Sequence, residues 1–135
     1  MTGTVLYFPE SIIESLVEGG DATVRARFGP ARLVKSQGIP LADASTLWAQ
    51  HGTLVVHEAE IEGALPETPA TVASGSLEVA GQKYIDMGPV PMDTHGYLEV
   101  RLVFAAGGEV TVTGSGGRLE MEGTPRYLRH LEESG

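Results

Sequence analysis

Hydrophobic and polar residues alternate over three runs in the C-terminal third of the chain, and paired glycines separate the runs. The apolar positions are Leu98, Val100, Leu102 and Phe104, then Val110 and Val112, then Leu119 and Met121. Side chains of a strand point alternately to opposite faces, so these residues would share one face, with charged residues and threonines on the other. The pattern predicts an antiparallel meander with a buried face and a solvent-exposed face.

The same alternation predicts strands at 5–8, 21–28, 32–36, 53–62, 70–74, 76–79 and 83–86. Gly29-Pro30 predicts a hairpin turn, Ala80-Gly81-Gln82 predicts a second tight turn, and Pro89 and Pro91 keep the segment between 87 and 96 extended. We therefore expect a mainly β fold of six to nine strands. The architecture would be an antiparallel β-sandwich or a partly open barrel, in a single domain spanning 1–135.

Short helices are expected to flank this sheet. Near 10–18 the apolar residues have helical spacing and Gly19-Gly20 would end the helix, while near 125–132 Thr124 and Pro125 suit an N-cap and a first helical position. The segment 43–50 predicts one helical turn that brings Leu47 and Trp48 onto the core, after a loop at 38–42.

Composition narrows the function classes. The net charge is −9, and no Lys or Arg occurs between Lys35 and Lys83. We expect no nucleic-acid ligand, because binding one needs clustered cations that neutralise phosphates. The acidic balance predicts either a merely soluble surface or a partner protein with a basic surface. The chain has no cysteine, no leader-like start and no apolar run of about 18 residues, so we expect a cytoplasmic protein without a membrane span.

Three glutamates, Glu58, Glu60 and Glu62, share a face of a predicted strand, with carboxylates roughly 7 Å apart. This spacing resembles the carboxylate pair of glycoside hydrolases, but the chain has a single Trp and four Tyr, too few for sugar-binding platforms. The glutamates are thus a solvated strand face or a partner-binding surface.

Histidine and aromatic residues suggest a pocket at one end of the sheet. His57 lies on the apolar face of its strand, and with Trp48, Tyr84 and His95 it would line a cavity rimmed by the proline-rich segment 87–95. Asp93 and His95 are too few for a metal site, so no metal or cofactor is expected. The glycines at 114–117 precede a strand and predict a turn, not a phosphate-binding loop.

Four of the nine cations fall within eleven residues, namely Arg25, Arg27, Arg32 and Lys35. They would either pair with the acidic strand or form a site for an anion or carboxylate.

The second half resembles small bacterial β-rich proteins of unassigned function over about 51–130. The resemblance lies in His-Gly-Thr-Leu at 51–54, Gly-Ser-Leu-Glu-Val at 75–79, Tyr84, Pro89-Val-Pro91, the apolar run 98–104, the glycine-flanked segment 108–116 and Gly-Thr-Pro-Arg-Tyr-Leu at 123–128. These are turns and core positions, so the resemblance implies a fold and no catalytic residues.

Together these features predict a small acidic adaptor or immunity-like protein without enzymatic activity, whose partner presents a basic surface. The alternatives are a small-molecule-binding β domain with the pocket at His57, and a hydrolase that uses His57. Exposed strand edges also allow homo-oligomerisation.

Overall fold

The computed structural model describes residues 3–36 and 45–131, and these residues form strands and no helix. Hence no described segment is a helix long and apolar enough to cross a membrane. In chain order the strands are β1 (Gly3–Tyr7), β2 (Ile12–Glu18), β3 (Val24–Ser36), β4 (Ser45–His57), β5 (Glu60–Gly63), β6 (Ala70–Val79), β7 (Gln82–Ile85), β8 (Met87–Pro89), β9 (Met92–Thr94), β10 (Leu98–Phe104), β11 (Glu109–Gly114) and β12 (Gly116–Leu131).

All strand pairs are antiparallel and belong to one sheet, ordered β5-β11-β10-β6-β2-β3-β4-β12-β9. β1 pairs with β3 and β8, and β7 pairs with β6. The two outer strands, β5 and β9, do not pair with each other, so the sheet is not closed. The expected mainly β, antiparallel fold is confirmed.

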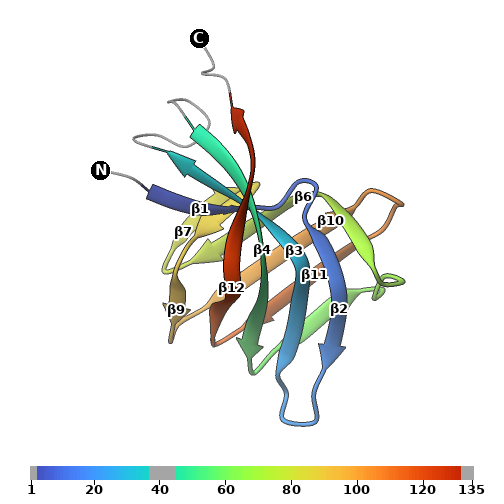
Figure 1. Ribbon diagram of the computed structural model, residues 1–135. Helices are drawn as coiled ribbons and strands as arrows, with labels where there is room; N and C mark the ends of the chain where they lie inside the picture. Colours follow the sequence, from blue (N-terminus) through green and yellow to red (C-terminus); the bar gives the residue numbers. More distant parts are fainter. Residues whose placement is uncertain (1–2, 37–44, 132–135) are drawn as a thin grey trace.

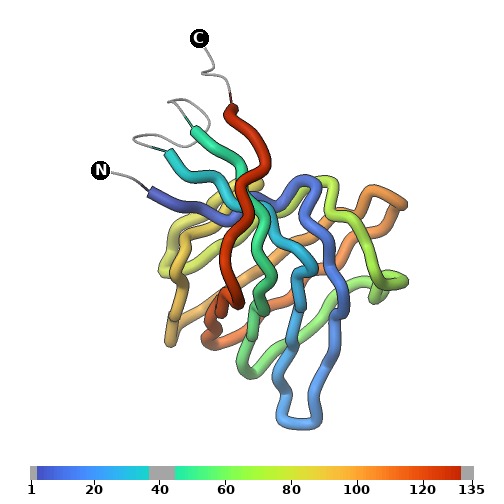
Figure 2. Tube along the Cα trace, viewed as in Figure 1, coloured from blue at the N-terminus to red at the C-terminus, as the bar shows by residue number. Residues whose placement is uncertain are grey.

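The three longest strands, β3, β4 and β12, run side by side through the molecule. Their ends near Ser36, Ser45 and Leu131 extend with β1 away from the remaining strands, toward the upper left of Figure 1, and Figure 2 shows the same course as a tube. The flanking strands β3 and β12 each bulge beside the middle of β4.

The core lies between two halves of the sheet, one containing β2, β3, β4 and β12 and the other containing β5, β6, β10 and β11. Most of its buried residues come from β2, β3 and β4 on one side and from β6, β10 and β11 on the other. Leu102 is 1% exposed and Val112 is 3% exposed, which confirms the buried face predicted for the C-terminal run. The third run of that pattern does not extend the hairpin, because Leu119 lies in β12, which pairs with β4 and β9 instead of β11.

The helix predicted near 10–18 is wrong, since this segment forms β2. A register shift lies between the pairs Ile13–Phe28 and Ser15–Arg27, so Glu14 is an extra residue in the strand. A bulge of this kind changes the alternation of side chains. Ile13 and Leu16 both reach the core although they are three positions apart, a spacing that imitates a helix.

The helix predicted near 125–132 is wrong for the same reason. The residues up to Leu131 continue β12, with register shifts between Glu122 and Arg126 and between Tyr127 and Arg129. Residue 132 lies outside the described residues, as does the loop predicted at 38–42. The helical turn predicted at 43–50 is a strand from Ser45 onward, in which Leu47 and Trp48 point to opposite faces.

Two further local predictions need correction. Gly29-Pro30 is not a hairpin turn: β3 runs through it with a bulge between Phe28 and Ala31. The strand predicted at 53–62 is broken at Glu58, which has a φ of 49° and separates β4 from β5. The tight turn predicted at Ala80-Gly81-Gln82 does join β6 to β7, and the positive φ of its first two residues fits a two-residue hairpin.

Candidate functional site

The outer face of β5, β11, β10, β6 and β7 carries glutamates in a row across the strands, and we call it the acidic face. Pairing aligns the residues Glu60, Thr113, Glu99, Glu78 and Lys83 in one row. The neighbouring row is Glu62, Thr111, Arg101, Ser76 and Ile85. Residues paired across antiparallel strands project from the same face, so the four glutamates in these rows face solvent together.

Glu99 and Glu78 lie directly opposite each other on β10 and β6. Neither forms an ion pair within the described part of the chain, and the same holds for Glu60 and Glu62. The one arginine of the face, Arg101, is taken by Glu109 through bonds of 2.7 Å from Nε to Oε1 and 2.8 Å from Nη2 to Oε2. The four glutamates therefore have no ion-pair partner among the described residues, although Lys83 and Arg101 lie on the same face.

Tyr97 stands at one end of the acidic face, with 54% of its surface exposed. Desolvation raises the pKa of its hydroxyl above 10.0, and the charges of Glu99, Glu78 and Glu62 raise it further. Beside it is a hollow of about 320 Å³ lined by Glu58, Glu60, Tyr97, Thr113, Gly114 and Ser115. The acidic face thus ends in a hollow with an aromatic wall.

The glutamates predicted to bind a partner all lie at this end of the sheet. Glu60 and Glu62 share one face of β5, as the period of two requires. Glu58 precedes the strand in the turn, yet it lines the same hollow as Glu60. The sequence analysis missed Glu78, Glu99 and Tyr97 as members, because only the pairing register places them beside β5.

Of the four residues predicted to line a ligand pocket, His57 and His95 lie close together. His57 pairs with Gly116 of β12, and Gly116 on its other side approaches His95: a Cβ on that glycine would lie 3.5 Å from the His95 Cα. Nη1 of Arg118 lies 3.2 Å from Nε2 of His57. The two histidines thus flank a glycine, with an arginine beside one of them.

Trp48 and Tyr84 lie elsewhere. Trp48 is nine positions from His57 along β4, roughly 30 Å for an extended strand, and it faces the opposite side. Its Nε1 donates to Thr46 Oγ1 at 2.8 Å, Lys35 Nζ lies 4.1 Å from its ring centroid, and Tyr127 meets it edge-on at 5.4 Å. Tyr84 packs against the core from β7. The cavities of about 480, 250, 320 and 440 Å³ are each lined by residues other than these four.

The other half of the sheet presents arginines. On β3 and β12 six of them project from the outer face on either side of β4: Arg25, Arg27, Arg32, Arg118, Arg126 and Arg129. Arg27 pairs with Glu14 and Glu122, and Arg118 pairs with Glu120. The chain therefore separates its charges. We call the outer face of β3, β4 and β12 the basic face, and the acidic face lies on β5, β11, β10, β6 and β7.

A metal centre is not indicated in the described part of the chain, where no three His, Asp or Glu side chains converge. Comparison of the chain with protein-family models, with curated proteins and with solved structures gave no match.

Proposed function

We propose that the protein is a non-enzymatic binding module that recognises a partner protein with a basic surface through the acidic face. The observation that carries this proposal is the direct pairing of Glu99 with Glu78 in a row that also contains Glu60. Like charges directly opposite on adjacent strands destabilise a sheet. Lys and Arg side chains of a partner would relieve this repulsion on binding, so the free protein holds a surface whose electrostatic cost falls in the complex.

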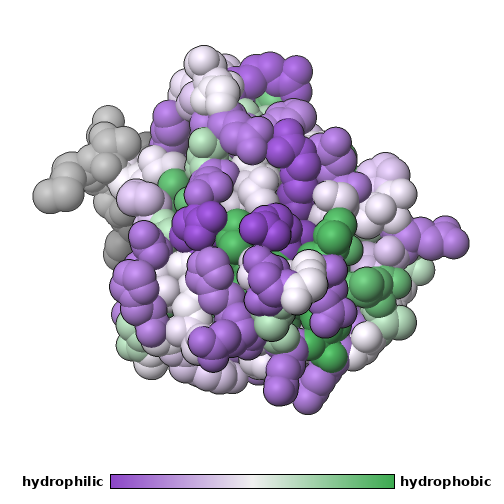
Figure 3. Space-filling view, turned by 90° about the horizontal axis from the view of Figure 1, so that it is seen from below, coloured by the Kyte–Doolittle hydropathy of each residue, from purple (hydrophilic) through white to green (hydrophobic). Residues whose placement is uncertain are grey.

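Charge complementarity also supports recognition at this face. Clustered charge of one sign speeds the encounter with an oppositely charged surface and opposes wrong partners. Tyr97 supplies an exposed aromatic contact at the end of the row, and tyrosine is enriched in protein interfaces. Figure 3 shows the molecule from below, where hydrophilic side chains cover much of the surface and hydrophobic ones lie among them, more of them on the right of the view.

The test compares two variants that remove the same number of negative charges. The first carries Glu60→Gln, Glu78→Gln and Glu99→Gln on the acidic face, and the control carries Glu10→Gln, Glu18→Gln and Glu67→Gln elsewhere. Immobilised proteins are exposed to lysate at low and high salt, and bound proteins are quantified. We expect a basic protein that the wild type and the control retain at low salt and the first variant loses. Equal retention by all three proteins contradicts the proposal.

Two finer features belong to the same proposal. We propose a partly open barrel, because β2 and β6 pair over only Ile12–Thr71 and Ile13–Ala70 and so turn the sheet back on itself.

The absence of cysteine from the sequence suits a reducing compartment, which supports a cytoplasmic location.

Small-molecule binding at His57, Trp48, Tyr84 and His95, the alternative weighed from the sequence, has less support because Trp48 lies roughly 30 Å from His57 along β4 and on its opposite face. A different cavity, on the basic face, favours a small ligand.

A further inference from the structure

A hollow opens on the basic face where two bulges lie side by side. β3 bulges between Phe28 and Ala31, and β12 bulges between Glu122 and Arg126. The extra residues are in β3 and β12 and not in β4, so both bulges lie beside the segment of β4 that contains Ala49 and His51. Bulges redirect side chains and are common next to functional sites.

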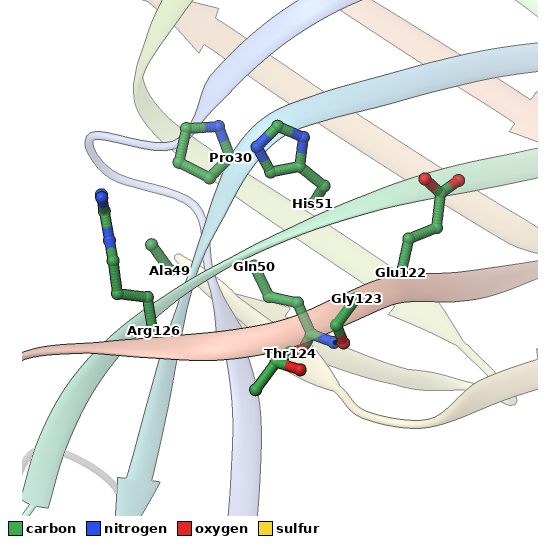
Figure 4. A pocket seen from close by; sticks show the side chains of 8 residues that line it. All are labelled: Pro30, Ala49, Gln50, His51, Glu122, Gly123, Thr124 and Arg126. Carbon is green, nitrogen blue, oxygen red and sulfur yellow. Dashed lines mark hydrogen bonds between the residues drawn. The ribbon is translucent and has the colours of Figure 1, made fainter.

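The hollow has a volume of about 480 Å³, which is within the range of small-molecule sites. Its lining residues are Pro30, Ala49, Gln50, His51, Glu122, Gly123, Thr124 and Arg126. Figure 4 shows that Arg126, Ala49, His51 and Glu122 extend to one side of the sheet, whereas Gln50 points to the other. There Gln50 Nε2 donates to the Gly123 carbonyl at 2.8 Å and supports the bulge from behind.

Two arginines without a carboxylate partner lie on the same face here, Arg126 in the wall of the hollow and Arg32 next to it on β3. Arg32 and Arg126 both pair with Ala49, one from each side, so their Cα atoms are roughly 10 Å apart with only a methyl group between them. Neither forms an ion pair with a residue of the described part of the chain, and Nε of Arg32 is buried without a hydrogen-bond partner.

The only carboxylate in the wall, Glu122, is already paired with Arg27, which also pairs with Glu14. Both oxygens of Glu122 accept from Arg27, at 3.1 Å from Nη1 and 3.2 Å from Nη2. Arg126 therefore has no carboxylate partner in the wall, and Arg32 adds a second positive charge next to it, in a chain in which acids outnumber Lys and Arg by 18 to 9. A carboxylate of the chain could neutralise the pair, yet the structure places none there among the described residues.

We propose that this hollow binds a small molecule carrying a compact dianionic group, with a phosphate monoester as its chemical class. Arg126 in the wall, with Arg32 next to it on the same face, would offset the charge of a dianion, and the planar fork of arginine suits tetrahedral phosphate oxygens. His51 and Pro30 border the space that remains for the organic part of the ligand. This site lies on the opposite half of the sheet from the acidic face, so it does not rest on the partner proposed above.

The test is an NMR titration of ¹⁵N-labelled full-length protein with glycerol phosphate, inorganic phosphate and succinate at constant ionic strength. We expect saturable shifts at the amides of Ala49, His51 and Arg126 with both phosphates, and weaker binding of succinate. No saturable shift up to roughly 10 mM phosphate, an affinity too weak for a specific site, overturns the proposal. Succinate binding as tightly as glycerol phosphate overturns the assignment to phosphate.

A matched pair of variants separates the site from general charge effects. Arg126→Gln removes an exposed arginine of the hollow, and Arg101→Gln removes the same charge from the other half of the sheet. The first should weaken glycerol phosphate binding about tenfold to a hundredfold and the second less than twofold. Equal weakening by both variants contradicts the site, as does tighter binding of a short single-stranded DNA with shifts along all of β3 and β12.

Phosphate binding by Arg32→Lys provides a second test, because this variant keeps the positive charge and loses the planar guanidinium group. Because Nε of Arg32 is buried, thermal unfolding of this variant is recorded first to establish that it is folded. Weakened phosphate binding by the folded variant supports contact with Arg32, and wild-type affinity excludes this residue from the site.

Discussion

Arg27 of β3 and Glu122 of β12 are 95 positions apart in the sequence, and they share two hydrogen bonds across the intervening strand β4. Both side chains are partly exposed, so the pair orients charges more than it stabilises the fold. Its consequence is local: Glu122 is held toward Arg27 and leaves Arg126 without an acidic partner.

The first prediction concerns which arginine Glu122 pairs with, Arg27 or Arg126. In Arg27→Gln, Glu122 is free to pair with Arg126 and lowers the positive charge of the hollow. We expect glycerol phosphate to bind several-fold more weakly in the same NMR titration, although Arg27 does not line the site. The double variant Arg27→Gln/Glu122→Gln should recover the wild-type affinity. Unchanged affinity in Arg27→Gln would show that Glu122 does not control the charge of the hollow.

Removal of Leu102 tests the buried face of the sheet. Leu102→Ala leaves a cavity in the core, and large-to-small substitutions at such sites cost about 2–5 kcal/mol of unfolding free energy. The control Val17→Ala changes a side chain that is 56% exposed and should alter stability by less than about 0.5 kcal/mol. Urea unfolding measures both. A loss below about 1 kcal/mol in Leu102→Ala would contradict the packing between the two halves.

Glu109 predicts part of the acid dependence of stability. Its hydrogen bonds from Arg101 lower the pKa of the Glu109 carboxyl below 4.5. A carboxyl with a lower pKa in the folded state stabilises the protein above its unfolded-state pKa, and this contribution is lost as the pH falls through the folded-state pKa. Glu109→Gln should therefore reduce stability at pH 7 and make the decrease between pH 5 and 3 shallower in thermal unfolding. An unchanged decrease of stability between pH 5 and 3 in Glu109→Gln would contradict a contribution of the Arg101–Glu109 pair.

The Glu99–Glu78 pair predicts a variant that is more stable and functions less well. Glu99→Gln removes a like-charge contact, so the free protein should gain up to about 0.5 kcal/mol at low salt. The gain should disappear at high salt, because ions screen exposed charges. Thermal unfolding at two salt concentrations measures this, with Glu67→Gln as the control. A loss of stability in Glu99→Gln would show that this glutamate has a structural role.

Much of the fold was predictable from the sequence, because alternation reports directly which positions face the core. The runs containing Leu102 and Val112 are strands with the expected buried face. The predicted helices failed at bulges: an extra residue at Glu14 gives Ile13 and Leu16 a helical spacing within a strand. Apolar residues three positions apart occur in a helix and also in a bulged strand, so their spacing alone does not distinguish the two structures.

The candidate sites were less predictable, because they depend on pairing between distant strands. Glu60 and Glu62 were identified, but their alignment with Glu99 and Glu78 requires the register of four strands. The hollow at Ala49 depends on two bulges that the sequence marks only by Gly29-Pro30 and Gly123-Thr124-Pro125, which are equally typical of a turn and of a helix start. Arg32 was noted in a group of cations, whereas Arg126 carried no signal of its own.

Photo-crosslinking in cells tests the central claim, that the acidic face contacts a basic partner, most directly. Thr111 lies on the acidic face between Glu62 and Arg101, and Thr53 lies on the basic face between Arg27 and Glu120. Both are partly buried threonines and accept a photoreactive residue under comparable conditions. The account predicts a crosslink from position 111, and none from position 53, to a partner segment rich in Lys and Arg. Crosslinks from position 53 alone, or from position 111 to a segment without excess positive charge, would contradict it.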